Sequence, residues 1–429
     1  MIFAHGVGSR TDLPLPVWLF AYGAGAALVI SFVTLRILWP KPRLEALATG
    51  RTLPPWSSTA VSVAGWAARV VGLALFGLVL VAAAAGTEES ASNVAPVAVY
   101  VLFWVGLQVA SAVLGDVWRV LSPWDTLALL ARRGPDRPGP DATHWPAVAG
   151  IAGFVWLELC YHRPDSPRVL ALGLTLYTLA MAGGVARFGR GWLRTGDGFA
   201  AWFGLLATMA PLYRDGNGRL RARLPFTGLA RVEPRAGTAA LILTVLGSTA
   251  FDGLSRTQWW ATVLGGRLGW EATAVRTLGL AFTIGVTAVA YVGAMRVAAW
   301  LDDEEPDSLV LPFVHSLVPI GLAYAVAHYF SLFVFEGQQA LALASDPLGR
   351  GADWFGTADW AIDYRALSTR TISFVQAGAI VVGHVVAVVV AHDRAVERFD
   401  PRDATRSQVP LLAVMVAYTV AGLAILLGT

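Results

Sequence analysis

An all-α fold of membrane-spanning helices is predicted by three features of the sequence. Hydrophobic residues make up 56% of the 429 positions, and charged residues make up only 14%. Soluble domains usually carry about 25% charged residues, so this chain has roughly half the usual charge. The 17 tryptophans suit a membrane protein, because Trp collects at membrane–water interfaces. The third feature is a series of long apolar runs, which gives the prediction its detail.

About ten apolar segments reach the roughly 20 residues that a hydrocarbon layer about 30 Å thick requires. Backbone groups cannot stay unpaired in lipid, so each segment is predicted to be a helix. Together they predict one transmembrane domain over residues 1–429, a polytopic helix bundle. The segments lie near residues 16–39, 68–86, 97–115, 145–162, 168–186, 238–255, 274–300, 309–335, 370–391 and 409–427.

The orientation of the bundle follows from the arginines and lysines between the spans. Short loops rich in these residues remain on the cytoplasmic side. The segments after the first, third, fifth and ninth spans are the basic ones, and the segment after the fifth is the densest. All four fall on one side if the spans alternate, so both termini are predicted to be outside. Basic residues include Lys41, Arg43, Arg119, Arg132, Arg133, Arg187, Arg190, Arg194, Arg394 and Arg398.

Several protein classes are excluded by simpler signals. No basic run interleaved with aromatic residues suits nucleic acid. A single cysteine, Cys160, rules out an internal disulfide. The start of the chain lacks a basic region and a cleavage site, so no signal peptide is expected. The apolar spans make the lipid bilayer one predicted partner, and a small solute or metal ion is the other.

Polar residues inside apolar spans are the candidate site, because charges at mid-bilayer cost about 2.5–3.5 kcal/mol on insertion scales. His328 shares a helical face with Tyr324, and Asp252 shares one with Ser248 and Ser255. Both lie toward the outer side in the predicted topology. The alternative is that His328 bonds a nearby carbonyl and Asp252 meets water at a helix end.

The end of the fourth span offers a second pair. Glu158 and His162 are at positions i and i+4 of the predicted helix, so they are expected to share a face. A carboxylate and an imidazole at this spacing can hold one divalent ion, or they can simply pair with each other. We predict that Glu158, His162, Asp252 and His328 converge on one metal site near the outer surface. Such ligands suit a divalent transition metal, zinc, manganese or iron, better than calcium.

Further polar residues extend this prediction to both membrane sides. His5 and Glu336 are expected outside, while His315 and His384 lie toward the cytoplasm. All four are additional candidates for the site. His392 is also expected toward the cytoplasm, in contact with solvent. Two basic, aromatic segments, 115–133 and 191–214, are expected to lie along the membrane surface.

Five runs of the sequence are similar to those of a known family. They are AHGVGSRTDLPLP (4–16), GDVWRVLSPW (115–124), FDGLSRT (251–257), AHYFSLFVFEGQQ (327–339) and SDPLGRGADWFGTADW (345–360). Together they resemble a family of actinobacterial polytopic membrane proteins often labelled fenitrothion hydrolase. The resemblance covers nearly the whole chain and implies a multi-pass protein of the bacterial plasma membrane. Its label implies hydrolysis of organophosphate esters, but it assigns no catalytic residue.

Three functions remain open from the sequence. The outer polar residues fit a transporter or a metal-handling membrane protein, which is the interpretation we favour. Alternatively, a metal held there activates water for ester hydrolysis, as the resemblance implies. In the third interpretation the chain is a structural subunit of a membrane complex, and its polar residues only join helices. Transport predicts polar residues continuing to the inner side, and hydrolysis predicts at least three metal ligands.

Overall fold

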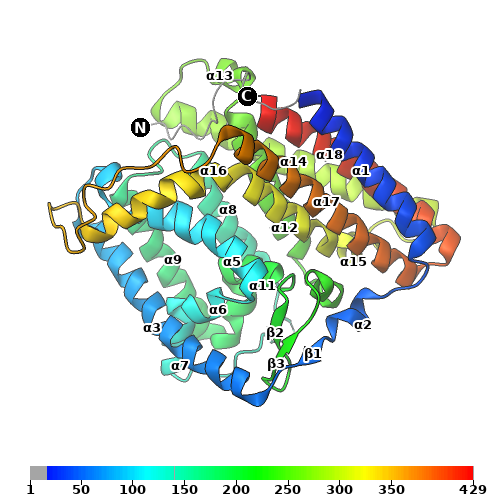
Figure 1. Cartoon of the computed structure of the whole chain (residues 1–429), viewed down its shortest axis with the longest axis horizontal. Helices are drawn as coiled ribbons and strands as arrows, with labels where there is room; N and C mark the ends of the chain where they lie inside the picture. The colour runs from blue at the N-terminus through cyan, green and yellow to red at the C-terminus, as the bar shows by residue number, and fades with distance from the viewer. Residues whose placement is uncertain (1–16, 140, 429) are drawn as a thin grey trace. The chain divides into compact units, whose positions relative to one another are not determined.

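The computed structural model describes residues 17–139 and 141–428, and these residues are mostly helical (Figure 1). They form two compact units, each built from separate stretches of the chain. Unit 1 holds the chain up to Gly50, Arg223–Phe330 and the chain from Leu367 onward. Unit 2 holds Arg51–Ala222 and Ser331–Ala366. The long helix α16 (Val318–Ser345) contributes its first part to unit 1 and its second part to unit 2.

Among the described residues, eight helices are long and apolar enough to cross a membrane. They correspond to eight of the predicted segments. They cover Pro55–Ala85 (α3), Val94–Leu114 (α4 to α5), Pro167–Phe188 (α9), Thr238–Ser255 (α12), Gly269–Leu301 (α14), Val310–Ser345 (α15 to α16), Thr369–Arg398 (α17) and Asp403–Leu423 of α18 (Pro401–Gly428).

The other two predicted segments are helical but shorter. Helix α1 (Val17–Leu38) is apolar over Tyr22–Leu38, and α8 covers only Trp145–Leu159. The predicted end of the fourth segment at residue 162 is therefore wrong. Pro164 bars continuation beyond His162, because a proline disfavours helical backbone at the residue before it, but it does not explain the end at Leu159.

In unit 1, α18 packs against α1, α14 and α17, which are seen together in Figure 1. Helices α12 and α14 approach closely at Gly247, where a Cβ atom would meet the backbone of Ile284. The remaining elements are short: α2 (Leu44–Ala48), a 3₁₀ turn at Thr227–Arg231, α13 (Gln258–Leu264), α15 (Val310–Val314) and a 3₁₀ turn at His315–Leu317.

The start of α2 is held by α17. The carboxylate of Asp393 accepts hydrogen bonds from the Trp39 indole at 2.8 Å and from the Arg43 backbone N–H at 2.7 Å. The neighbouring His392 is 2% exposed, and its ring nitrogens face the Gln408 side chain and the Trp39 carbonyl. The expectation that His392 meets solvent is wrong, because α18 and the α1–α2 connection cover it.

Unit 2 has an aromatic core around α11 (Gly198–Ala207). Trp202 and Phe203 are fully buried, and the Trp202 indole donates to Gln108 of α5 (Leu107–Leu114) at 2.9 Å. Nearly every residue of α11 is buried, so this helix does not lie on a surface as the sequence led us to expect. The short elements around it are 3₁₀ turns at Ser90–Ser92 and Arg190–Trp192, α4 (Val94–Pro96), the π-helical Val97–Gly106, α6 (Trp118–Leu121), α7 (Pro123–Leu130) and α10 (Leu193–Gly196).

Unit 2 also contains a small antiparallel sheet that an all-α prediction omits. Its order is β1 (Arg51–Thr52), β3 (Leu220–Ala222) and β2 (Leu212–Arg214), with Arg51 opposite Ala222. The turn between β2 and β3 is built on Asp215, whose carboxylate accepts from two backbone N–H groups. The sequence DGNG is a hairpin signal that would have predicted it.

Candidate functional site

A buried ion cluster joins two helices of unit 1. His328 on α16 lies 2.7 Å from Asp252 on α12, measured from imidazole Nε2 to carboxylate Oδ2. Their side chains are 8% and 7% exposed. Arg256 donates to the other oxygen of the same carboxylate, with Nη2 2.9 Å from Oδ1. The carboxylate is therefore held from two sides, and its charge is balanced by the guanidinium.

The local sequence explains why these groups meet. Asp252 lies in the last turn of α12, and Arg256 follows one turn later, where the helix ends. Thr257 then caps the start of α13, with its side chain accepting from the Trp260 N–H. The spacing of four residues at the end of the helix places Arg256 beside Asp252. Because a carboxylate only accepts hydrogen bonds, His328 carries a proton on Nε2.

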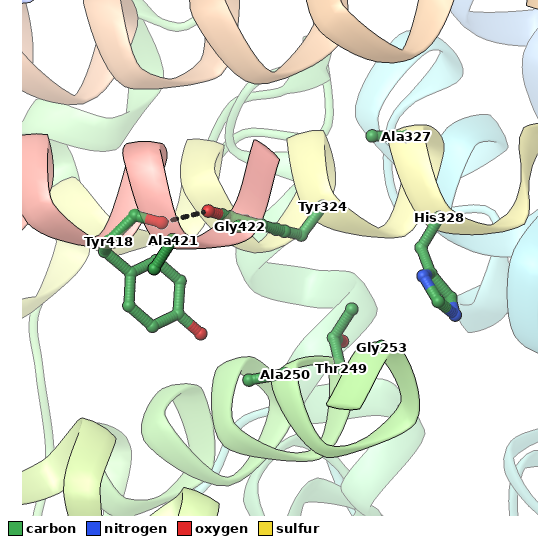
Figure 2. Close-up of a pocket in the computed structure, with 9 residues that line it drawn as sticks. All are labelled: Thr249, Ala250, Gly253, Tyr324, Ala327, His328, Tyr418, Ala421 and Gly422. Atoms are coloured by element: carbon green, nitrogen blue, oxygen red, sulfur yellow. Dashed lines mark hydrogen bonds between the residues drawn. The ribbon is translucent and has the colours of Figure 1, made fainter. Parts of the chain in front are cut away.

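A small cavity adjoins His328 (Figure 2). Its volume is about 80 Å³, room for a few water molecules or part of a small solute. The polar groups on its wall are His328, Thr249 and two tyrosine side chains. Tyr324 donates to the Tyr418 carbonyl at 2.9 Å, and Tyr418 donates to the Leu246 carbonyl at 3.1 Å. The lining residues are Thr249, Ala250, Gly253, Tyr324, Ala327, His328, Tyr418, Ala421 and Gly422.

The close packing of α18 on α16 defines one wall of this cavity. The Tyr324 hydroxyl lies directly against Gly422, where any Cβ atom would collide with it. Glycine at this position therefore leaves room for the tyrosine beside the cavity. The resulting cavity is mainly apolar, with His328 of the ionisable pair on its wall.

The second predicted pair has a different geometry. Helix α8 ends at Leu159, so Glu158 and His162 do not share a helical face as the spacing suggested. The His162 ring instead lies 4.5 Å from the ring of Tyr161, centroid to centroid. Both residues are half-buried and belong to unit 2, whereas Asp252 and His328 belong to unit 1. Convergence of all four residues therefore remains a prediction. In the described part of the chain, no group of three or more His, Cys, Asp or Glu side chains is arranged to hold a metal.

The additional candidates fall into three groups. His315 and His384 are both buried in unit 1, and the His384 Nδ1 donates to the Ile380 carbonyl at 2.8 Å. Glu336 is half-buried on the part of α16 that belongs to unit 2. His5 lies outside the described residues. Of the described candidates, His315 and His384 belong to the same unit as Asp252 and His328, and Glu336 does not.

The sequence analysis missed a second charged network, in unit 2. Asp125 is bound by Arg69 of α3 at 2.8 Å and by Arg190 at 2.9 Å, with all three side chains at least 90% buried. Arg69 was the available signal, because a lone arginine in an apolar span needs a partner. Nearby, burial raises the pKa of Asp136, but Arg194 and its neighbours outweigh this and hold the pKa below its ordinary value.

Comparison with protein-family models, with curated proteins and with solved structures gives no match.

Proposed function

We propose that this chain is a multi-pass protein of the bacterial plasma membrane, with about ten spans and both termini outside. The eight long apolar helices support this, and α1 and α8 would complete the set. Helix α8 has 15 residues, which is about 22 Å of helix. It is short for a full crossing, so we expect the residues around its ends to sit in the headgroup region.

We further propose that unit 1 moves a small solute or ion across this membrane. The observation that carries the proposal is the buried Asp252–His328 pair beside a cavity, on helices of membrane-spanning length. Ionisable groups are expensive at this depth, and those that persist commonly mark solute, ion or proton pathways. His315 and His384 are buried in unit 1, and in the proposed topology they would supply polar groups toward the inner side, as transport requires.

The alternatives receive less support. A metal-dependent hydrolase of organophosphate esters, which the family resemblance implies, needs about three protein ligands to an activating metal. The oxygens of Asp252 are already occupied by His328 and Arg256, and no three-ligand group occurs in the described chain. A metal-handling role meets the same difficulty. A purely structural subunit would need the charged pair but would have no use for the cavity beside it.

Transport can be tested in liposomes that contain the purified full-length protein. Uptake would be measured for a panel of labelled inorganic cations, small anions and small organic acids, with a trapped dye reporting protons. We expect uptake of at least one class, reduced tenfold or more by Asp252→Asn and by His328→Gln. Asp359→Asn, at an exposed position, serves as the control. Equal uptake in all variants, with thermal midpoints near that of the wild type, would contradict the proposal.

A further inference from the structure

The C-terminal ends of two helices of unit 2 are joined by backbone contacts. Helix α7 ends at Leu130 and α9 ends at Phe188, and the loops that follow them lie side by side. The backbone N–H of Arg190 donates to the Arg133 carbonyl at 2.7 Å. Gly191 packs so tightly against Arg137 that a Cβ atom would collide with its carbonyl. These contacts give the region a fixed backbone.

The acidic groups beneath this region are already neutralised. Asp125 is bound by Arg69 and Arg190. Asp136 is bound by Arg194 at 2.7 Å and by Arg119 at 2.6 Å. Neither carboxylate is therefore available to the other arginines of the two loops.

Four arginines, three in the loop after α7 and one in the last turn of α9, are exposed at the surface beside three exposed apolar side chains. Leu127, Leu130 and Phe188 are 50%, 61% and 63% exposed, and the guanidinium of Arg187 lies 5.2 Å above the Phe188 ring. The only exposed acid described in the 131–141 loop is Asp141. This surface, which we call the basic rim, consists of Leu127, Leu130, Arg132, Arg133, Arg137, Arg187 and Phe188.

We propose that the basic rim binds the headgroups of anionic phospholipids. Guanidinium groups donate two parallel hydrogen bonds to a phosphate, which suits the phosphodiester of a lipid. The exposed leucines and phenylalanine would contact the glycerol and the upper part of the acyl chains. Four arginines against one acid give the rim an excess of positive charge. Anionic surfaces attract such segments by about 1 kcal/mol per basic residue.

The apolar half of the rim is what selects a lipid over a soluble anion. A free phosphate would use only the arginines and would leave Leu127, Leu130 and Phe188 in water. On a lipid surface both halves are satisfied at once, as in helices that lie at the membrane interface. In this proposal α7 contacts the membrane surface, as the sequence analysis expected for residues 115–133.

The experiment is native mass spectrometry of the full-length protein with an equimolar mixture of phosphatidylglycerol and phosphatidylcholine. The test variant replaces Arg132, Arg133, Arg137 and Arg187 by Gln. The matched control replaces four other exposed arginines by Gln, namely Arg163, Arg267, Arg365 and Arg370. A third variant, Leu127→Gln with Leu130→Gln, tests the apolar half, and inorganic phosphate at millimolar concentration tests competition by a soluble anion.

We expect the wild type and the control to retain phosphatidylglycerol preferentially. The test variant should lose this preference about tenfold or more. Loss of two arginine contacts would be enough for a change of this size, and the variant lacks four arginines. The leucine variant should retain less of both lipids, and phosphate should not compete. The proposal is overturned if the wild type has no preference, if the control loses it equally, or if phosphate displaces the lipid while the leucine variant behaves as wild type.

Discussion

His328 and Asp252 form a hydrogen bond of 2.7 Å between α16 and α12, with both side chains more than 90% buried. Seventy-six residues separate them in sequence. Arg256 holds the same carboxylate. Removal of either Asp252 or His328 leaves the other, a buried polar group, without the hydrogen bond that joins them. This relationship gives the first prediction.

We predict strong coupling between the two residues in a double-mutant cycle. Asp252→Ala and His328→Ala should each lower the free energy of unfolding by about 3–5 kcal/mol, as breaking a buried pair usually does. The double variant should be little worse than the poorer single variant. Reversible unfolding in mixed micelles provides the measurement. Asp359→Ala combined with Asp252→Ala is the control and should be additive; additivity in the Asp252–His328 cycle as well would mean that the pair does not act as a unit.

Metal content separates transport from the metal-handling alternative. Because both Asp252 oxygens already accept hydrogen bonds, we expect zinc, manganese and iron to remain at background in the purified wild type. A chelator should not change the thermal midpoint. The measurement is metal stoichiometry for the wild type, Glu158→Ala and His328→Ala. A stoichiometric metal that both substitutions remove would support the shared site of Glu158, His162, Asp252 and His328 instead.

A pH effect is expected at the end of α14, outside the membrane-spanning segment. The side chain of Asp302 is 2% exposed, and within the described chain its carboxylate has no hydrogen-bond partner, with Arg406 Nε 3.6 Å away. Burial raises the pKa of Asp302, and nearby acids add to this against the opposing effect of Arg406. The carboxyl of Asp302 therefore binds its proton more tightly in the folded protein than in the unfolded chain. The contribution of protonated Asp302 to the stability of the folded protein is therefore present at low pH, and it is lost as the pH rises through the raised pKa.

Asp302→Asn should therefore raise the thermal midpoint at pH 7 by several degrees and have little effect near pH 4. Glu305→Gln, at an exposed position of the same loop, should change neither value. Thermal scans from pH 4 to pH 8 provide the test. A lower midpoint for Asp302→Asn at pH 7 would show that the ionised carboxylate stabilises this corner of unit 1.

The helices could be predicted well from the sequence because long apolar runs without breaks are directly visible in it, and eight of the described helices match such runs. It also selected Asp252 and His328, because charged groups stand out in such runs. It could not predict their contact, since pairing across 76 residues depends on how α12 and α16 pack. Glu158 and His162 failed as a helical pair because α8 ends at Leu159, three residues before His162.

Burial within the bundle was harder to predict. The segment that contains α11, residues 191–214, has the mixture of Trp, Leu and Arg that is typical of a surface helix. Nearly every residue of α11 itself is nevertheless buried. His392 lies near the basic end of α17, where contact with solvent was expected. The structure instead covers it with α18 and the α1–α2 connection. In both cases tertiary contacts, which a single sequence does not contain, decide the environment.

The proposed topology can be tested with single cysteines in a Cys160→Ala background. We predict that Asp359→Cys is labelled by an impermeant thiol reagent in intact cells, because residues 337–369 are expected outside. Asp400→Cys, between α17 and α18, should be labelled only after permeabilisation. Both positions are exposed, so access depends on the side of the membrane. The reverse pattern would invert the topology.

The most direct test of the central claim is the accessibility of the cavity beside His328. Ala250, which lines it, would be replaced by Cys in the same Cys160→Ala background and exposed to a small charged thiol reagent. If solute reaches the Asp252–His328 pair from outside, intact cells should show modification of Ala250→Cys, more slowly than of Asp359→Cys. Modification only after permeabilisation, or none while Asp359→Cys reacts fully, would contradict an outward-facing transport site.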